Sequence, residues 1–524
     1  MRVQPGLVVR VCLPSYYRVH SEMETQQRHC WECRRRCLVC DFTEPACKRC
    51  STAGVECPGY SHIKPQRLKW LAPGRVTSRS RKRKGSHSPS APVENDPGDK
   101  TNSVMTEQPS MIIAFNMTIP RYELKTDVCS LPEAAEYFNS CIYRELAPIQ
   151  ELGNNPHIYQ LSITHIQRAV NKPDYLNFGM LCMTLSHRIN RTRNDHQYKL
   201  LAEKFYLYWG LAVRSLNEQL GVQDRQTSDL VMAGIMTLLL ADVQQGTSLN
   251  WRCHLEGIHR LIALRGGFHA VASSASLEPL LLSLCVAAIG NTTCAASDLI
   301  MTESYLDALE LLLEKYAAAV SPIHMCPLPL FAEIIKINHL RMQAISCDFA
   351  LLDDLSKEGF EILDHIHAFS SELWASSKSL HQEDWVLIGK VYQAAAALYC
   401  ILSLQSLSVL PETPDLRACC AAHGQVLWLL LDVGLSCPRT RRSLIWPLVL
   451  LGVEAVRGGP KMRAFASEKL PELSYDAGTF VPLMAKSVLR SFWDSGETRW
   501  DACFDRPYVF TSQIAVDTSR ISSG

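Results

Sequence analysis

The chain has 524 residues, of which 47% are hydrophobic and 20% are charged. This is the composition of an ordinary soluble globular protein, and the length exceeds what one core usually holds. The formal net charge of +1 conceals a division, because residues 28–84 carry 15 Lys and Arg against 4 Asp and Glu. That window has a net charge of +11, which leaves −10 for the rest of the chain. Clustered positive charge favours a nucleic-acid partner, although a solvated basic tail would show the same balance.

The cysteines are also unevenly distributed. Seven of the 21 lie in residues 30–57, and the other fourteen are scattered. The apolar run at residues 7–13 is too short for a secretory signal and contains an arginine, so a reducing compartment is expected. In such a compartment, dense cysteines indicate metal binding rather than disulfides. Scattered cysteines in apolar stretches are expected to be buried as small hydrophobic residues, among them Cys182, Cys285 and Cys400.

The first two elements along the chain are an extension and a cysteine-rich module. Residues 1–27 show no clear periodicity and are predicted to be disordered, whereas residues 28–60 carry six cysteines in two similar halves. Each half has a pair separated by two residues and a third cysteine after six more. Such pairs suit tetrahedral zinc, and six thiolates serve two ions if two of them bridge both metals. The spacing therefore predicts two Zn²⁺ ions held by Cys30, Cys33, Cys40, Cys47, Cys50 and Cys57.

The residues of this module carry a family resemblance. Residues 30–41, Cys-Trp-Glu-Cys-Arg-Arg-Arg-Cys-Leu-Val-Cys-Asp, followed by Pro45-Ala-Cys47, are similar to the fungal binuclear zinc cluster transcription factors. The resemblance implies a small module with two short helices, in which Cys30 and Cys47 bridge the metals. Of the remaining ligands, it assigns Cys33 and Cys40 to one zinc ion and Cys50 and Cys57 to the other.

The same resemblance implies that the first short helix addresses CGG-type triplets in the major groove of double-stranded DNA. An arginine on that helix can donate two hydrogen bonds to guanine or can pair with phosphate. Cys37 stands where the family usually has a base-contacting lysine, and losing one such contact costs roughly 1–3 kcal/mol of discrimination. A tolerated substitution is favoured for Cys37 over a seventh ligand or a redox switch. The predicted DNA contacts are Arg34, Arg35, Arg36, Lys48 and Arg49.

Residues 61–124 are predicted to be a basic and Ser/Pro-rich linker without a packed core. Prolines at 65 and 73 interrupt the region after the cysteines, so no coiled-coil dimer is expected there. A compact basic run in the linker has the composition read by a nuclear import receptor, and it could also contact DNA phosphates. The predicted nuclear localisation signal consists of Arg79, Arg81, Lys82, Arg83 and Lys84.

Residues 125–524 show apolar residues at helical spacing and are predicted to form a large all-helical domain. In residues 198–220, for example, apolar side chains recur every three or four residues. Further along the chain, Gly266-Gly267 is expected to end the helix that directly precedes these two glycines. Helices are also expected near residues 133–147, 174–190, 228–242, 251–262, 299–316, 328–345, 357–375, 384–409, 414–433 and 479–493.

This domain resembles the fungal-specific transcription factor domain, a wholly helical regulatory region. The similarity is carried by residues 254–267, which end in the double glycine, and by Phe492-Trp493 and Trp500-Asp501. His254 and His259 are five residues apart and poorly placed to chelate one metal. The resemblance permits a small hydrophobic effector, and a homodimer, if one forms, would use this domain.

Membrane and enzyme functions are weighed against the same sequence. Residues 391–410 contain no charge and are long enough to span a bilayer, but their polar residues and helical neighbours favour a buried core helix. The sequence contains no nucleophile elbow, no His-Glu-x-x-His motif, no phosphate-binding loop and no dinucleotide fingerprint, so no enzyme activity is predicted. Asp364, His365 and His367 do not share one helix face and are assigned to the surface.

Together these features predict a nuclear, zinc-dependent, sequence-specific regulator of genes transcribed by RNA polymerase II. Its expected partners are DNA, the transcription machinery and an import receptor, without a membrane. The alternative is a zinc-cluster module that binds proteins through its arginines and binds DNA weakly or without specificity.

Overall fold

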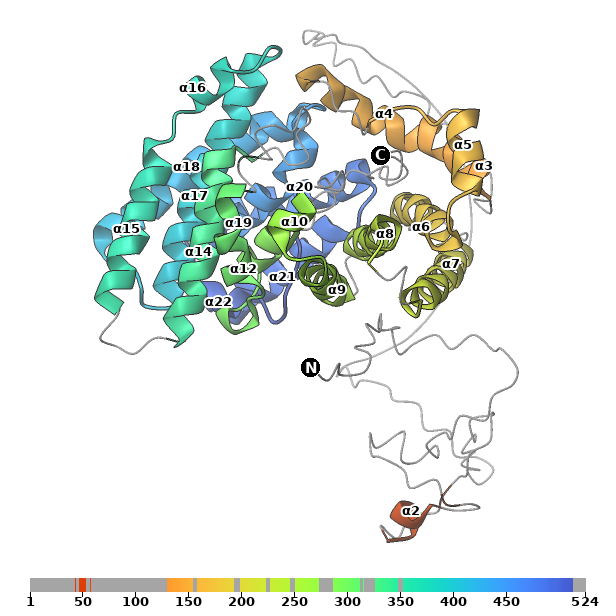
Figure 1. The fold of residues 1–524 in the computed structure, drawn as a ribbon. Coiled ribbons are helices and arrows are strands. Elements are labelled where there is room, and N and C mark those ends of the chain that lie inside the picture. Colours follow the sequence, from red (N-terminus) through yellow and green to blue (C-terminus); the bar gives the residue numbers. More distant parts are fainter. Residues whose placement is uncertain are drawn as a thin grey trace, which may run out of the picture. The chain divides into compact units, whose positions relative to one another are not determined.

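The computed structural model divides the chain into two units, Arg18–Tyr122 and a larger unit that contains Glu123–Gly524. We call the larger unit the helical body. Every regular element in the described residues is a helix (Figure 1), so the predicted mostly helical fold is confirmed for them. The structure describes residues 43, 47–52 and 57 in the smaller unit and, in the body, residues 130–153, 158–192, 198–222, 227–245, 250–272, 286–311, 314, 326–346 and 352–511.

The first part of the body packs three long helices side by side, with short helices at their edge (Figure 1). On α7 the predicted apolar stripe is turned inward, where Leu201 and Leu216 are fully buried. The helices of this first part are α3 (Leu131–Tyr137), the π-helical turn η1 (Phe138–Ile142), α4 (Tyr143–Leu146), the 3-10 turn η2 (Ala147–Leu152), α5 (Ile163–Val170), α6 (Asp174–Arg191), α7 (Tyr198–Leu220) and α8 (Asp229–Gln245).

The middle of the body begins with the helix that the double glycine was expected to end. The φ angles of Gly266 and Gly267 are +93° and +91°, a conformation that glycine adopts without steric cost. The Gly267 N–H donates to the Ile262 carbonyl at 2.9 Å, which confirms this termination. The helices here are α9 (Asn250–Leu264), α10 (Phe268–Ala272), the 3-10 turn η3 (Ala296–Asp298), α12 (Thr302–Asp307) and α14 (Leu328–Ser346).

The last part of the body is organised around α17, which packs against α14, α15, α16, α18 and α19. Residues 394–397 of α17 are four consecutive alanines, all buried, whose small side chains let neighbouring helices approach closely. The helices of this part are α15 (Leu352–Ala368), α16 (Ser371–Ser376), α17 (Gln382–Ser406), α18 (Pro414–Ser436), the 3-10 turn η5 (Arg441–Leu444), α19 (Ile445–Gly458), α20 (Pro460–Ala477), α21 (Val481–Ser495) and α22 (Trp500–Cys503).

The single helix expected over residues 357–375 is wrong, because the structure has two helices there. α15 ends at Ala368, and the Ser370 hydroxyl accepts the Leu373 N–H to begin α16. The Gln393 side chain on α17 donates to the carbonyls of Ile366 and Phe369 at 2.8 and 2.9 Å. These tertiary hydrogen bonds satisfy the end of α15, which residue periodicity on that helix does not reveal.

Helices α19 and α20 were not predicted. Residues 445–455 of α19 are all buried, so their apolar residues surround the helix and leave no stripe. α20 contains Pro471 in its interior, which sequence rules take as a helix breaker. The omission of α19 comes from treating amphipathic periodicity as the mark of a helix, and that of α20 from treating an interior proline as its end.

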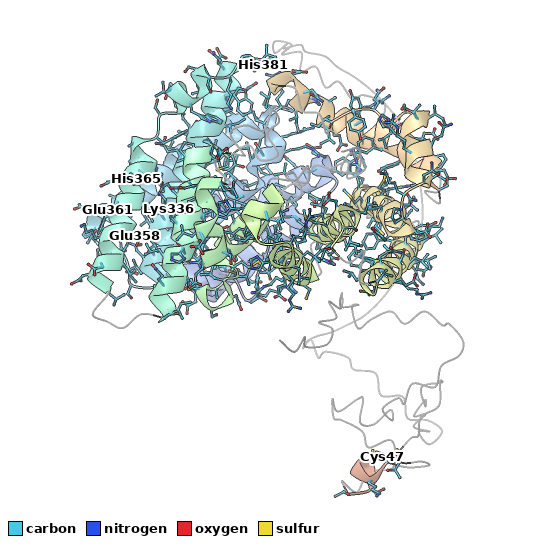
Figure 2. The ribbon with its side chains drawn as sticks, in the orientation of Figure 1. Cys47, Lys336, Glu358, Glu361, His365 and His381 are labelled. Carbon is cyan, nitrogen blue, oxygen red and sulfur yellow. The ribbon has the colours of Figure 1, made fainter. Side chains whose placement is uncertain are left out.

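α14 and α15 are joined by a small charged group on one side of α15. The Glu333 carboxylate lies 2.8 Å from the Lys336 ammonium and 3.6 Å from Nδ1 of His365. Figure 2 shows His365 following Glu358 and Glu361 along α15. This side of α15 therefore carries His365, and residues two positions away point elsewhere.

Two described helices, α17 and α18, are long and apolar enough to cross a membrane by length and composition. In α17 78% of the apolar window is buried within the body, as expected for residues 391–410 if they form a core helix. In α18 the buried share is 28%, and its exposed side includes Val426, Leu429 and Val433.

The C-terminal end of the described body packs back against its middle. The Tyr508 N–H donates to the Thr293 carbonyl at 3.0 Å, and the Thr293 hydroxyl donates to the Tyr508 carbonyl at 2.7 Å. Phe510, two residues later, is fully buried. Residues far apart in sequence thus close the same core.

Candidate metal centre

The smaller unit contains one described helix, α2 (Lys48–Thr52), at whose start two cysteines are brought together. Cys47 lies directly before the helix and Cys50 lies within it, so the turn between them follows from the two-residue spacing. The Cys50 N–H donates to the Cys47 sulfur at 3.3 Å, and the Ser51 N–H donates to the Cys47 carbonyl at 3.2 Å. The local fold therefore places the Cys47 sulfur where the Cys50 N–H donates a hydrogen bond to it.

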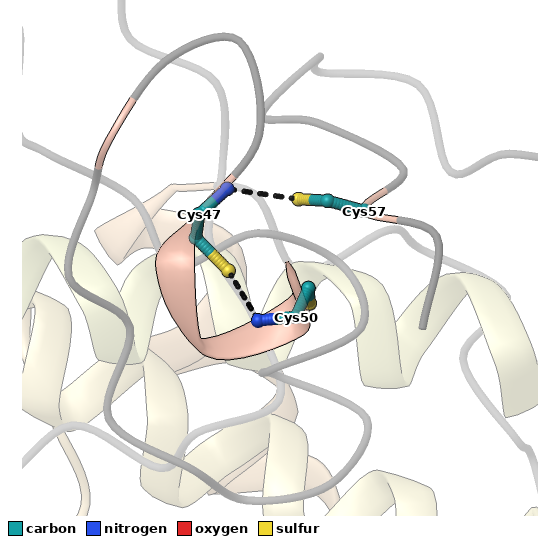
Figure 3. Close-up of side chains that lie close together, drawn as sticks. All are labelled: Cys47, Cys50 and Cys57. Atoms are coloured by element: carbon teal, nitrogen blue, oxygen red, sulfur yellow. Dashed lines mark hydrogen bonds between the residues drawn. The ribbon is translucent and has the colours of Figure 1, made fainter. Parts of the chain in front are cut away.

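Cys57 approaches this pair from a later part of the chain, as Figure 3 shows. Its sulfur accepts the Cys47 N–H at 3.4 Å, and the three sulfur atoms lie within 4.8 Å of one another. Cys47 is fully buried and Cys50 is 1% exposed, so these polarisable groups face inward. The arrangement gathers three thiol ligands around one point.

The geometry fits a thiophilic metal ion. Zinc–sulfur bonds of about 2.3 Å at tetrahedral angles place two sulfur ligands about 3.8 Å apart, which agrees with sulfur atoms confined within 4.8 Å. Sulfur ligands favour zinc over hard ions such as magnesium or calcium. Cys47, Cys50 and Cys57 could therefore hold one metal ion, and they are three of the four ligands that the resemblance assigns to one of the two zinc ions.

Most other predicted site residues lie outside the described residues. These include the remaining ligands and the first-helix arginines, namely Cys30, Cys33, Cys40, Arg34, Arg35 and Arg36. They also include the proposed import signal, Arg79, Arg81, Lys82, Arg83 and Lys84. Lys48 is exposed on α2, and Arg49 belongs to the same helix, although its side chain is not described.

Comparison with known proteins gives this geometry a family context. A family model described as the fungal specific transcription factor domain matches residues 134–506. The chain belongs to this transcription factor family. The match covers the helical body and does not include the cysteine-rich module.

A curated fungal protein resembles the transcription factor over nearly its whole length. The phomenoic acid biosynthesis cluster-specific transcriptional regulator of Leptosphaeria maculans is 49% identical over 506 residues, covering 96% of this chain and 92% of the relative. No solved structure matches the chain.

The transcription factor's helical body contains a buried charged network that joins its first and last parts. The Glu145 carboxylate accepts from Nε2 of His187 and from Arg442, both at 3.2 Å, and also pairs with Arg191. The Tyr137 hydroxyl lies 3.1 Å from Nδ1 of His187. Burial, reinforced by the Arg442 charge, lowers the pKa of His187 to about 3, so this histidine is neutral at physiological pH. A neutral imidazole with its proton on Nε2 satisfies both partners.

A second network centres on Arg341 of α14, whose side chain is fully buried. Its guanidinium donates to the carbonyls of Asn291 and Cys294 at 2.8 Å, and to the Tyr399 hydroxyl and the Asp501 carboxylate at 3.0 Å. These partners come from the middle of the body, α17 and α22. The buried charge is therefore compensated by groups that hold three distant segments in place.

His254 of α9 is buried and has a partner on α8. Its Nε2 lies 3.0 Å from the Asp242 carboxylate, and its ring packs edge-on against Trp209. Glu454 on α19 is buried, and its Oε2 atom has no hydrogen bond among the described residues. Burial raises the pKa of Glu454 to about 7.

Sequence analysis missed one grouping of chemically active side chains in the body. It considered His367 only with its neighbours on the same helix, whereas the structure places it against Cys419 and His423 of α18. The spacing of Cys419 and His423 by four residues puts them on one helix face and could have indicated half of this group. The third member required knowledge of how α15 packs.

Proposed function

We propose that this protein is a zinc-dependent, sequence-specific DNA-binding regulator of genes transcribed by RNA polymerase II. The observation that carries the proposal is the convergence of the Cys47, Cys50 and Cys57 thiols in a member of a transcription factor family. These three cysteines belong to a set of six regularly spaced cysteines that would supply the ligands for two zinc ions.

The metal supplies the fold of the module. With Cys30 and Cys47 as bridging ligands, each zinc ion has four thiolates, and the short segment between the halves is tied at both ends. Because the cysteine-rich module is short and has little apolar surface to bury, zinc binding contributes most of its folding free energy. Removing a bridging thiolate is expected to be more damaging than removing Cys33, because a bridge serves both ions.

Sequence recognition is assigned to the arginines that follow Cys33. Arg36 lies next to Cys37 at the end of the proposed recognition helix and contacts a guanine edge, whereas Lys48 and Arg49 of α2 hold the phosphate backbone. Base-edge contacts determine which sequence is bound, and phosphate contacts make binding dependent on salt. CGG-type triplets are the proposed targets.

The basic run at residues 79–84 is proposed to bind an import receptor and bring the protein to the nucleus. A reporter fused to residues 60–110 should then accumulate there, and cytoplasmic retention would assign import to another segment. By similarity to the relative from Leptosphaeria maculans, the target genes are proposed to belong to a biosynthetic gene cluster.

The test is competition binding by the full chain at fixed salt, with duplexes that contain or lack a CGG-type triplet. We expect the wild type to prefer the triplet, and Arg36→Ala to reduce that preference while largely retaining affinity for random duplex. Lys48→Ala should weaken both duplexes alike. Cys37→Lys should tighten binding to the triplet by restoring a cation. Equal loss on both duplexes in Arg36→Ala would contradict the proposed base contact.

A second candidate function is a protein-interaction module, favoured by Cys37 where a base-contacting lysine is usual. It predicts equal, weak retention of both duplexes at physiological salt, even when the module holds zinc. The same competition assay therefore separates the two functions.

A further inference from the structure

Three side chains with metal-binding atoms meet on the surface of the helical body, far along the sequence from the cysteine-rich module. His367 lies in the last turn of α15, and Cys419 and His423 lie on α18. The Nε2 atoms of the two histidines are 3.0 Å apart, and the Cys419 sulfur is 3.9 Å from Nε2 of His367. All three ligand atoms fall within 4.8 Å of one another.

The fold holds these residues in place before any ligand arrives. Cys419 and His423 are four residues apart, so they stack on one face of α18, which is the spacing of paired ligands on a metal-binding helix. On the other side, Gln393 of α17 donates to the backbone carbonyls of Ile366 and Phe369, which fixes the turn that carries His367. α17 packs against both α15 and α18 and so sets their separation.

The distances match those of a tetrahedral zinc site. With zinc–nitrogen bonds of about 2.0 Å and zinc–sulfur bonds of about 2.3 Å, two nitrogen ligands lie about 3.3 Å apart, and nitrogen and sulfur about 3.5 Å apart. The observed 3.0 and 3.9 Å deviate from these values by less than half an ångström.

The chemistry and surroundings favour a cation. Two imidazoles and a thiol form a ligand set of intermediate softness, which suits zinc better than magnesium or calcium. His367 also lies beside the C-terminal end of α15, where the helix dipole is negative. His367 is exposed and the other two ligands are half-buried, so an ion can enter and a water molecule can fill the fourth position.

Without metal, the two rings lie parallel and share a hydrogen bond, in which one Nε2 donates and the other accepts. Metal binding would use both Nε2 lone pairs, move the donor's ring proton to Nδ1 and release the Cys419 thiol proton to solvent. The hydrogen-bonded pair therefore already holds the two Nε2 atoms close together.

We propose that His367, Cys419 and His423 form a zinc(II) site on the helical body, with three protein ligands and an open fourth position, which links α15 to α18. The site is separate from the cysteine-rich module and does not depend on the proposed binding of DNA. Its occupancy would couple the packing of the regulatory domain to the supply of zinc.

The test measures zinc bound by the full chain after equilibrium dialysis against free zinc, with elemental analysis. Each of His367→Gln, Cys419→Ser and His423→Gln should bind one zinc ion per chain fewer than the wild type. The matched controls are His365→Gln, two residues away on another face of α15, and Cys437→Ser, which follows α18. Both controls should retain the full zinc content.

Cobalt(II) then reports on ligand identity, since a thiolate bound to tetrahedral cobalt gives a charge-transfer band. The difference spectrum between wild type and Cys419→Ser should contain such a band, and that between wild type and Cys437→Ser should not. Circular dichroism confirms that the variants remain folded. Equal zinc content in wild type and all three ligand variants would overturn the proposal and leave a hydrogen-bonded histidine pair.

The cysteine-rich module gives an independent control. Cys47→Ser should lower the zinc content of the module. The cobalt difference spectrum between Cys47→Ser and the double variant Cys47→Ser/Cys419→Ser should nevertheless equal the one between wild type and Cys419→Ser. Failure of the body site would remove this difference spectrum, whereas failure of the proposed function would appear as undiminished DNA binding by Cys47→Ser.

Discussion

The described part of the cysteine-rich module is a single short helix beside three thiols, whereas the helical body buries whole helices against one another. The module has Cys47 and Cys50 as its described buried side chains. In the body, one fully buried leucine contributes about 1.5–3 kcal/mol, and there are many. Burial of apolar side chains stabilises the body, whereas metal binding is proposed to stabilise the module, so metal removal should affect the two units differently.

The largest effect is expected in the module. Cys47→Ser should reduce DNA binding at least 100-fold, because it removes a proposed ligand of both zinc ions. Far-ultraviolet circular dichroism should change little, since the body supplies most of the helix. Cys253→Ser, an exposed cysteine of the body, serves as the control and should bind DNA as the wild type does. A parallel loss of body helicity in Cys47→Ser would contradict the separation of the two units.

The next largest effect should come from the buried cation of the body. Arg341→Met removes four hydrogen bonds and leaves buried carbonyl groups and Asp501 without their partner. We expect the free energy of unfolding to fall by about 3–5 kcal/mol, measured by urea denaturation. Arg490→Met provides the control, because Arg490 is exposed and pairs with Asp494 at 4.0 Å. That change should stay within about 0.5 kcal/mol.

Two glycines with similar backbone angles separate steric contact from backbone strain. The φ angles of Gly478 and Gly496 are +60° and +74°, so alanine is strained at both. At Gly478 a new Cβ would lie 2.1 Å from the His187 ring, whereas nothing lies within 4 Å at Gly496. We expect Gly478→Ala to cost about 2–3 kcal/mol and Gly496→Ala about 1 kcal/mol by thermal unfolding. Equal costs would mean that the side chains hydrogen-bonded to His187 rearrange without a further loss of stability.

The smallest expected effect depends on pH. Because the pKa of buried Glu454 is about 7, above its usual 4.5, the folded state holds the proton more tightly than the unfolded state. The stabilisation is complete below pH 4.5 and is lost as pH rises towards 7. Glu454→Gln should therefore flatten this dependence and raise the free energy of unfolding at pH 8 by about 1–2 kcal/mol. Glu468→Gln, at an exposed position on α20, should leave the pH profile unchanged.

Much of the body could be predicted, because its helices have one apolar face. Residues 198–220 coincide with α7, and the double glycine ends α9 as expected. Cys182 and Cys400 are fully buried as predicted, while Cys285 lies outside the described residues. The fully buried α19 was missed, because a helix surrounded by other helices has no polar side to reveal its period.

The two candidate metal sites also differ in how far they could be predicted from sequence. The ligands of the cysteine-rich module are close in sequence, so their spacing alone groups Cys47, Cys50 and Cys57. The site on the body joins residues of α15 and α18, more than fifty positions apart, through helix packing. Periodicity indicates where many of the helices lie but does not determine which faces meet, so His367 could not be joined to its partners from sequence.

The paired hydrogen bonds between Thr293 and Tyr508 also constrain when the body can fold. A ribosome that has made α9 through α21 has not yet released the segment that contains Phe510, so the core is incomplete at that stage. The body can therefore complete its core only after the chain has been made through Phe510. A polypeptide truncated before residue 508 would expose apolar surface and would therefore be a substrate for chaperones and proteases.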